Sequence, residues 1–253
     1  MFSLKGRTAI VTGAGSKHGI GRATALALAS QGADVAVCDI NEESARAVAD
    51  EIRALGRKSI AMKANVTSPD DVKNVVKTVV AEWKKIDILV NNAGITQPIK
   101  VADMTPDDFD RVVAVNLKGT FLFSQAVAPY MTAQGYGRIV NLSSVSGKRG
   151  GGVFGGAHYS AAKAGILGFA KALAREVGPY GVTVNSVAPG LVLTDIRGGI
   201  ESQAEQEKMA ADIPVRKLCT ADEIAAAICF LASTEAACIT GEEIDINGGL
   251  HMD

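Results

Sequence analysis

The chain contains few aromatic residues, few prolines and, among 253 residues, only four cysteines: Cys38, Cys219, Cys229 and Cys238. Their spacing fits no metal-binding or redox motif, so we expect reduced thiols in a cytoplasmic protein and no bound metal. Acidic and basic residues nearly cancel to a net charge of −1, which gives no electrostatic case for a nucleic-acid partner. Because no apolar run is long enough to span a bilayer, and residues 1–5 form no apolar signal core, we expect no membrane partner.

Short apolar runs alternate with helical segments along the whole chain. Runs typical of buried strands lie at 7–12, 34–38, 59–63, 86–90, 137–143, 182–187 and 243–246. Ser68, Thr105 and Thr220 each carry the capping signal of a helix start. No linker or low-complexity segment divides the chain, so we expect one domain over 1–253. The alternation predicts an α/β fold, a Rossmann-type doubly wound parallel sheet of about seven strands with helices on both faces.

The first apolar run leads directly into a glycine-rich turn. This turn spans 12–21 and is followed by an Ala/Leu-rich segment, 22–29, that is typical of a helix. Glycines let a backbone approach a pyrophosphate, and a helix N-terminus offers free N–H groups and a positive dipole end. Strand, turn and helix in this order predict a dinucleotide-binding loop. The loop residues that we expect to bind the cofactor are Gly13, Gly15, His18, Gly19, Ile20 and Gly21.

An acidic residue ends the second predicted strand. Asp39 lies eighteen residues after Gly21, close to the spacing typical of a carboxylate that binds an adenosine ribose. Such a carboxylate accepts hydrogen bonds from the ribose diol and repels a 2′-phosphate. Asp39 therefore favours NAD as the cofactor over NADP, while the basic residues Lys17 and His18 in the loop weakly favour the opposite choice.

A tyrosine and a lysine lie four residues apart, at Tyr159 and Lys163. On a helix they share one face. An ammonium beside a phenol favours the phenolate and lowers the phenol pKa, so the pair is a candidate general acid/base. Ser144 ends another predicted strand, and the carboxyl ends of parallel strands meet at one edge of a sheet. We therefore expect Asp39 and Ser144 to lie at the same edge.

In combination, these motifs make the chain resemble the short-chain dehydrogenase/reductase family in its single-domain form. The resemblance covers 4–249 and depends on motifs in the family's order: the loop 12–21, Asn91-Asn92-Ala93-Gly94, Asn116, Ser144, Tyr159 with Lys163, and Pro189-Gly190 with Thr194. It implies an NAD-dependent oxidoreductase that interconverts a secondary alcohol and a ketone. The catalytic residues that it implies are Asn116, Ser144, Tyr159 and Lys163.

The resemblance also implies a role for each of these side chains. Tyr159 exchanges the proton with the substrate, and Lys163 both lowers the tyrosine pKa and holds the nicotinamide ribose. Ser144 hydrogen-bonds the substrate oxygen, and Asn116 anchors a water molecule next to the lysine. Besides the loop, Asp39, Tyr159 and Lys163, the implied cofactor contacts are Ile40, Asn65, Val66, Asn92, Ala93, Gly94, Pro189, Gly190, Val192 and Thr194.

The chain departs from the family pattern at three places. The glycine loop is two residues longer than usual between Gly13 and Gly19. Asn65 stands where relatives usually carry an aspartate for the adenine amino group, and its side-chain carbonyl can accept the same hydrogen bond. The stretch between Ser144 and Tyr159 is long and rich in glycine, which predicts a mobile or closely approached wall beside the active site.

The substrate is less well defined by the residues. In the family, the segment that corresponds to 191–218 covers the substrate, and here it holds few aromatic residues and several charged ones. This composition favours a small polar substrate: a polyol, a sugar, a sugar acid or another hydroxy acid, anionic ones included. The expected substrate contacts are Ser144, Arg149, His158, Tyr159 and Arg197.

Two other functions stay open. One is NADPH-dependent 3-oxoacyl-[acyl-carrier-protein] reduction, whose enzymes present arginines near the active-site mouth at positions where this chain has Gly135 and Tyr180. The other is a non-catalytic NAD-sensing protein on the same scaffold. The resemblance further implies a homotetramer that assembles through the predicted long helices 106–133 and 157–178.

Overall fold

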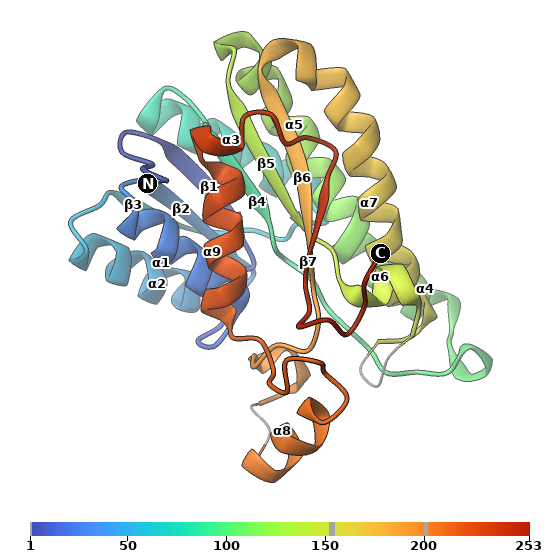
Figure 1. Ribbon diagram of the computed structural model, residues 1–253. Coiled ribbons are helices and arrows are strands. Elements are labelled where there is room, and N and C mark those ends of the chain that lie inside the picture. The colour runs from blue at the N-terminus through green and yellow to red at the C-terminus, as the bar shows by residue number, and fades with distance from the viewer. Residues whose placement is uncertain (1, 152–154, 200–201) are drawn as a thin grey trace.

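Seven parallel strands form one central sheet in the computed structural model, which describes residues 2–151, 155–199 and 202–253. The strand order is β3-β2-β1-β4-β5-β6-β7 (Figure 1). The strands are β1 (Thr8–Thr12), β2 (Asp34–Asp39), β3 (Ser59–Lys63), β4 (Ile88–Asn91), β5 (Gly137–Leu142), β6 (Val182–Pro189) and β7 (Glu243–Ile246). The predicted α/β class is confirmed, and every predicted strand is present to within two residues at each end.

Helices cover both faces of this sheet. On one side lie α1 (Ile20–Ser30), α2 (Glu42–Ala54) and α9 (Ala221–Ala232), and on the other lie α3 (Pro69–Trp83), α5 (Gly119–Gln134) and α7 (Ala157–Val177). Shorter helices are α4 (Pro106–Val113), α6 (Val145–Arg149) and α8 (Gln203–Ala210). None of the helices in the described residues is both long and apolar enough to cross a membrane.

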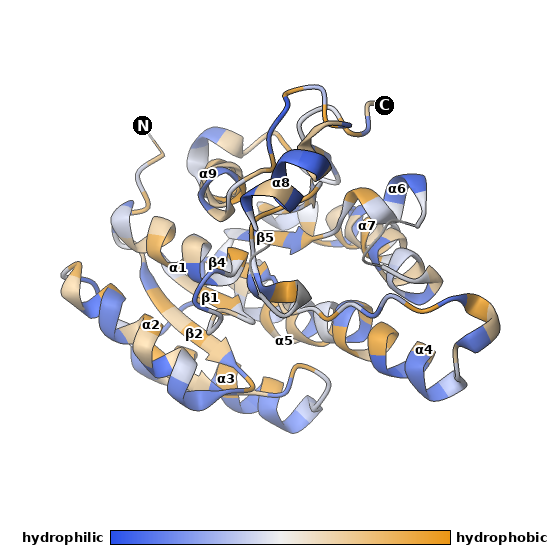
Figure 2. Ribbon diagram, turned by 90° about the horizontal axis from the view of Figure 1, so that it is seen from below, coloured by the Kyte–Doolittle hydropathy of each residue, from blue (hydrophilic) through white to orange (hydrophobic). Residues whose placement is uncertain are grey.

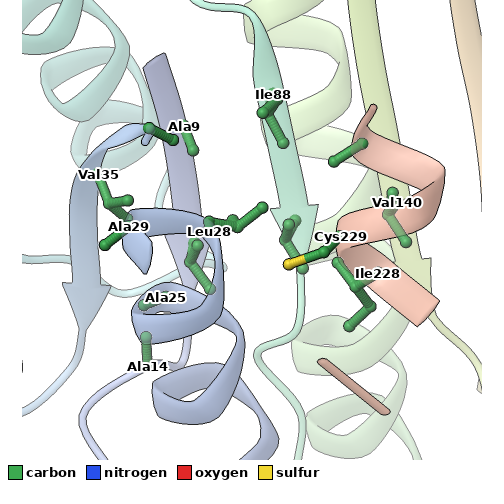
Figure 3. Packing of buried hydrophobic residues seen from close by; sticks show 14 of the residues in the cluster. Ala9, Ala14, Ala25, Leu28, Ala29, Val35, Ile88, Val140, Ile228 and Cys229 are labelled. Carbon is green, nitrogen blue, oxygen red and sulfur yellow. The ribbon is translucent and has the colours of Figure 1, made fainter. Parts of the chain in front are cut away.

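Strand side chains alternate between two separate hydrophobic cores, and this explains the continuous apolar runs in the sequence. In β1, Val11 packs into the core under α1, α2 and α9, while Ile10 packs into the core under α3, α5 and α7. Strands buried on both faces are apolar at most positions rather than at alternate ones. Figure 3 shows the first core, with Leu28 of α1 and Ile228 of α9 on one side of the sheet. Hydrophilic residues lie along the outer sides of helices such as α4 (Figure 2).

The predicted helix over 106–133 is present as one unbroken helical run, but it is not a regular α-helix throughout. A π-helical turn, Ala114–Lys118, separates α4 from α5. Single π-turns of this kind widen a helix locally and are frequent at functional sites. The turn changes the direction of the residues around Asn116, and helical periodicity in the sequence carries no sign of it.

The carboxyl ends of the strands lie at the lower edge of the sheet in Figure 1, where α8 projects beyond the two helical layers. The glycine loop follows β1 at this edge, and Asp39, Asn91 and Pro189 are the last residues of β2, β4 and β6. The strand ends therefore bring together residues that lie far apart in the sequence.

Candidate active site

A cleft of about 1140 Å³ opens along this edge of the sheet. Most residues predicted for the site line it: Gly13, Gly19, Ile20, Asp39, Ile40, Asn65, Val66, Asn92, Ala93, Gly94, Asn116, Ser144, Arg149, Tyr159, Lys163, Pro189, Gly190, Val192 and Thr194. One continuous wall thus carries both the residues expected to bind a dinucleotide and those expected to transfer a proton.

The N-terminus of α1 has the features of an anion site. Gly19 is the N-cap residue and provides no side-chain cap, and the first turn holds no acidic residue. In contrast, Asn41, Ser68 and Thr105 cap α2, α3 and α4 with their side chains. The first N–H groups of α1 therefore lack an internal side-chain acceptor and suit a pyrophosphate.

Asp39 lies directly beneath the glycine loop. Its Oδ2 accepts a hydrogen bond from the Gly15 backbone N–H at 2.8 Å, and its Oδ1 accepts one from the Asn41 N–H at 3.0 Å. An ionised carboxylate has further lone pairs for a ribose diol. Gly15 itself is not on the cleft wall; it holds the carboxylate in place from below, and a Cβ there would lie 2.9 Å from the Asp39 carboxyl carbon.

Gly21 is likewise buried behind the wall, where α1 packs against the turn after β4. A Cβ at this position would lie 2.4 Å from Nδ2 of Asn92 and 2.5 Å from the Gly13 carbonyl oxygen. The same Nδ2 donates hydrogen bonds to the Thr12 and Gly13 carbonyls, at 2.9 and 2.8 Å. Gly21 thus permits the close approach that positions the loop, rather than a contact with a ligand.

We expect a Gly21→Ala substitution to lower the free energy of unfolding by about 1–3 kcal/mol, since the methyl group must displace Asn92 or the loop backbone. Gly178→Ala is the matched control, because a Cβ at Gly178 meets nothing within 4 Å. Urea denaturation of both variants measures the effect. Equal stability of the two variants would contradict the tight packing at Gly21.

Tyr159 and Lys163 lie on the first turns of α7, as predicted, and Ser144 lies between β5 and α6. The Lys163 Nζ donates a hydrogen bond to the Leu142 carbonyl at 2.5 Å and lies 5.6 Å from the centre of the Tyr159 ring. The Tyr159 and Ser144 side chains are hydrogen-bonded to each other. The Ser144 Oγ also accepts the Ser146 N–H at 3.1 Å, which fixes the serine rotamer beside the tyrosine.

The predicted lowering of the Tyr159 pKa by Lys163 is not what the structure shows. Burial is the strongest influence and raises the pKa of Tyr159, and the hydrogen bond with Ser144 opposes it only in part. Burial also lowers the pKa of Lys163 to about 7. Because the lysine is buried and its ammonium is costly to desolvate, it holds its proton weakly near neutral pH. The spacing of Tyr159 and Lys163 in the sequence predicts that the two side chains lie close together. It does not predict how deeply they are buried, and burial determines both pKa shifts.

These pKa directions predict a pH dependence for alcohol oxidation. Oxidation needs the Tyr159 phenolate, so kcat/KM for oxidation should rise between about pH 6 and about pH 9 as that form becomes more populated. Ketone reduction uses the protonated phenol, which persists over this range, and should change much less. Initial rates in both directions across the range test this. An oxidation rate that is independent of pH would contradict it.

Asn116 occupies the π-turn and is fully buried. Its Nδ2 donates to the Ile95 and Val112 carbonyls, both at 2.9 Å, while its Oδ1 is buried without a hydrogen-bond partner. A Cβ on Gly94 would lie 2.7 Å from this oxygen and 3.5 Å from the Lys163 Nζ. A buried acceptor without a partner near the Lys163 amino group agrees with the expected water site, which stays a prediction.

The glycine-rich stretch before α7 is closely approached where the structure describes it. A Cβ at Gly147 would lie 2.7 Å from the Lys163 carbonyl carbon, and one at Gly155 would lie 2.7 Å from the Tyr159 ring. These glycines let the wall pack against the catalytic turns of α7. Residues 152–154 lie outside the described residues.

Two predicted contacts are placed elsewhere. His158 is fully buried, and its ring packs near Gln97 and accepts the Tyr159 N–H at Nδ1 rather than lining the cleft. His18 is also off the cleft wall, because its ring and its N–H both bind Asp195. Arg197 belongs to a short 3-10 turn, Asp195–Arg197, and its side chain lies outside the described part of the structure.

Several wall residues were not predicted from the sequence. Ile95 and Thr96 directly follow the Asn-Asn-Ala-Gly motif, and extending that motif by two residues would have found them. Lys208, Met209 and Asp212 reach the cleft from α8 and the turn after it. No local pattern signals their position, because it depends on how the whole segment 191–218 folds over the sheet edge.

On the adenine side, Asn65 forms a turn of its own. Its Oδ1 accepts hydrogen bonds from the Thr67 N–H and hydroxyl, at 3.0 and 2.9 Å. Ile40 is 66% exposed at the cleft, which leaves an apolar surface for a base to cover. The predicted adenine contact through Asn65 therefore competes with Thr67 for the same oxygen.

This fold and this site define a dinucleotide-dependent oxidoreductase of the short-chain type, and the relatives of the chain agree. The family model described as "Enoyl-(Acyl carrier protein) reductase" matches residues 13–251. An uncharacterized short-chain type dehydrogenase/reductase, y4mP, of Sinorhizobium fredii is 46% identical over 248 residues, or 98% of each chain. The 3-oxoacyl-[acyl-carrier-protein] reductase FabG of Escherichia coli is 42% identical over 251 residues, covering 99% of this chain and 100% of FabG.

A solved structure is similar over the same length. The crystal structure of a short-chain type dehydrogenase/reductase from Mycobacterium marinum superposes with a TM-score of 0.92 at 35% identity, covering 100% of this chain and 98% of that one. The chain belongs to the short-chain dehydrogenase/reductase family, and it is an NAD(P)-dependent oxidoreductase.

Proposed function

We propose that the protein is an NAD-dependent dehydrogenase that interconverts a secondary alcohol and a ketone. The observation that carries the proposal is one cleft with Ser144, Tyr159 and Lys163 at one end and Asp39 beneath the glycine loop at the other. A nicotinamide cofactor bound along this wall supplies the hydride acceptor or donor. The N-terminus of α1, which has no side-chain cap, binds the phosphates of the cofactor.

The side chains then divide the remaining work. Tyr159 accepts the hydroxyl proton during oxidation and returns it to the oxygen during reduction. Ser144 donates a hydrogen bond to the same substrate oxygen and stabilises the charge that develops there. Lys163, held by the Leu142 carbonyl beside Asn116, carries the proton between the tyrosine and the water site expected at Asn116.

The choice of NAD over NADP depends on Asp39. Its carboxylate is fixed by the Gly15 and Asn41 N–H groups at the end of β2, where a ribose diol can donate to it and a 2′-phosphate is repelled. His18 bonds to Asp195 and lies off the wall. This weakens the argument that the basic loop residues bind a 2′-phosphate.

Among the polar substrates expected, we favour a hydroxy acid and its keto acid. Apolar side chains line the cleft that holds Ser144 and Tyr159, among them Ile95, Val145, Leu191 and Met209. Charged groups line the same cleft, with Arg149 after Ser144 and Lys208, Glu205 and Asp212 on α8 and the turn after it. Such a pocket suits an apolar carbon at the reacting centre and a carboxylate that reaches a basic side chain.

Reduction of 3-oxoacyl groups on a carrier protein is the alternative, favoured by the similarity to FabG. The argument against it from Gly135 and Tyr180 is weaker than expected. Gly135 ends α5 and Tyr180 precedes β6, at the amino edge of the sheet. Within this chain these positions are remote from the cleft mouth. A non-catalytic NAD sensor, in turn, has no use for the complete proton-transfer set.

Absorbance of the reduced nicotinamide tests the proposal. NAD and NADP are each run against a panel of hydroxy acids, sugar acids, polyols and sugars, and NADPH is run separately against a 3-oxoacyl thioester. Turnover of one polar alcohol with NAD supports the proposal. Oxidation of NADPH with the 3-oxoacyl thioester, and no turnover of any other substrate, would establish the carrier-protein reductase instead. No absorbance change with any substrate would favour the NAD-sensing protein.

We also propose the homotetramer and the cytoplasmic location that the resemblance implies. Phe109, Phe121 and Tyr130 are each at least 40% exposed on α4 and α5, and Gly168 of α7 faces open space. Gly165 instead packs on Leu117 within the chain. All four cysteines are free, as a reducing compartment requires. Sedimentation equilibrium tests the assembly, and a monomer would contradict it.

A further inference from the structure

Asp195 joins the glycine loop to the segment that covers the cleft. Its Oδ2 accepts hydrogen bonds from the Ser16 hydroxyl at 3.0 Å and the His18 backbone N–H at 2.9 Å. Its Oδ1 lies 2.9 Å from the His18 Nδ1. These contacts cross 177 residues of sequence, and we call the group of Ser16, His18 and Asp195 the clasp.

The clasp spans the cleft where the cofactor phosphates are expected. Ser16 and Asp195 both line the cleft wall, next to Gly19 at the N-terminus of α1 and to Thr194. Thr194 is 5% exposed and is one of the expected nicotinamide contacts. His18 lies in the part of the loop between Gly13 and Gly19 that is two residues longer than usual, so the longer loop is what brings this ring to Asp195.

The segment 194–199, which carries Asp195 and which we call the arm, is anchored on the side of β6. Before it, Leu193 donates to the Cys219 carbonyl at 3.0 Å and Cys219 donates to the Leu191 carbonyl at 2.9 Å. After Asp195, Gly198 and Gly199 adopt φ of +92° and +152° with open space around them. Glycine adopts such a left-handed backbone without steric strain, and small residues often form hinges. The clasp therefore acts on a short arm that can swing about these glycines.

The function proposed above places a dinucleotide in this cleft, and the following proposal rests on that function. We propose that His18 and Asp195 are positioning residues that close the arm over the bound nicotinamide cofactor, and that the clasp must open before the cofactor leaves. In the closed position Asp195 holds Thr194 against the cleft. The rate of cofactor release is then set partly by the clasp.

The electrostatics agree with this role. Burial raises the pKa of Asp195, but the hydrogen bonds from His18 and Ser16 outweigh it and hold the pKa below its usual range. The carboxylate is therefore ionised near neutral pH and faces the phosphate loop. The hydrogen bonds from Ser16 and His18 stabilise the carboxylate at this position. Lys208 and Asp212 from the α8 side, and Lys17 in the loop, are the nearby charges on the other elements.

Stopped-flow release of NADH from the full-length protein tests the proposal. His18→Ala and Asp195→Ala should each speed release about threefold to tenfold, the size expected for losing the net contribution of one ordinary hydrogen bond at an exposed site. The double variant should be no faster than the faster single one, because both changes break the same contact. KM for the cofactor should rise, while hydride transfer in the preformed complex should change less than about twofold.

Two further variants separate positioning from general damage. His18→Asn keeps a donor near Oδ1 and should restore slow release. Asp50→Ala removes an exposed ion pair with Arg53 on α2, remote from the cleft, and should leave release unchanged. If wild-type protein fails to bind NADH, the proposed function fails; if it binds NADH and His18→Ala releases it at the wild-type rate, the clasp is wrong and the function stands.

Discussion

A Tyr159→Phe variant is expected to fold normally and to turn over about 10²–10⁴-fold more slowly than the wild type. The phenol is the one hydroxyl in the cleft that both contacts Ser144 and lies beside Lys163, among the residues that the structure describes. Phenylalanine keeps the ring and its packing against Gly155 but has no proton to exchange. The loss corresponds to about 3–5 kcal/mol of transition-state stabilisation.

Steady-state kcat in both directions measures this effect, with circular dichroism as the test of folding. Tyr180→Phe is the matched control, because Tyr180 is 55% exposed at the opposite edge of the sheet and should retain wild-type activity. Cofactor affinity should be nearly unchanged in Tyr159→Phe. A Tyr159→Phe enzyme within a few-fold of wild-type turnover would exclude this tyrosine as the acid/base.

The second large effect is expected at Asp39. Replacing it with asparagine removes the charge but keeps an oxygen that can accept the Gly15 or Asn41 N–H. A charge pair a few ångströms apart at a protein surface is worth about 1–4 kcal/mol, so the ratio of kcat/KM for NAD to that for NADP should fall about 10- to 100-fold. Two changes should lower the ratio. Weaker binding of the ribose diol lowers kcat/KM for NAD, and weaker repulsion of the 2′-phosphate raises kcat/KM for NADP.

The measurement is kcat/KM with each cofactor at a fixed substrate concentration. Asp34→Asn is the control, because Asp34 begins the same strand and binds Arg57 at the far edge of the sheet. It should alter stability without altering the cofactor ratio. An Asp39→Asn enzyme with an unchanged ratio would show that selection lies elsewhere on the adenine side.

Local patterns in the sequence were sufficient to predict the strands, the helix starts and the edge of the sheet that holds the site. The helices that start at Ser68, Thr105 and Thr220 are capped by these side chains, as the capping patterns indicate. Strands buried on both faces are largely apolar along their length, so their positions were predictable. The carboxyl ends of parallel strands meet at one edge of the sheet, which is why the sequence predicts that Asp39 and Ser144 lie in one cleft.

Other features depend on contacts between distant segments, and no local pattern encodes them. The π-turn at Asn116 interrupts a segment that looks like one helix. The pKa of Lys163 is set by the depth of its burial, which spacing to Tyr159 does not reveal. His18 was predicted to bind the cofactor because it lies in the glycine loop, but its partner, Asp195, is 177 residues away. His158 lies next to the catalytic tyrosine in sequence and points away from the cleft.

Titration of the wild-type protein with NADH and with NADPH, followed by the fluorescence of the reduced nicotinamide, tests the central claim most directly and requires no substrate. With Asp39 fixed beneath the loop, NADH should bind at least about tenfold more tightly, or by about 1.4 kcal/mol. Tighter binding of NADPH, or no binding of either, would contradict the account.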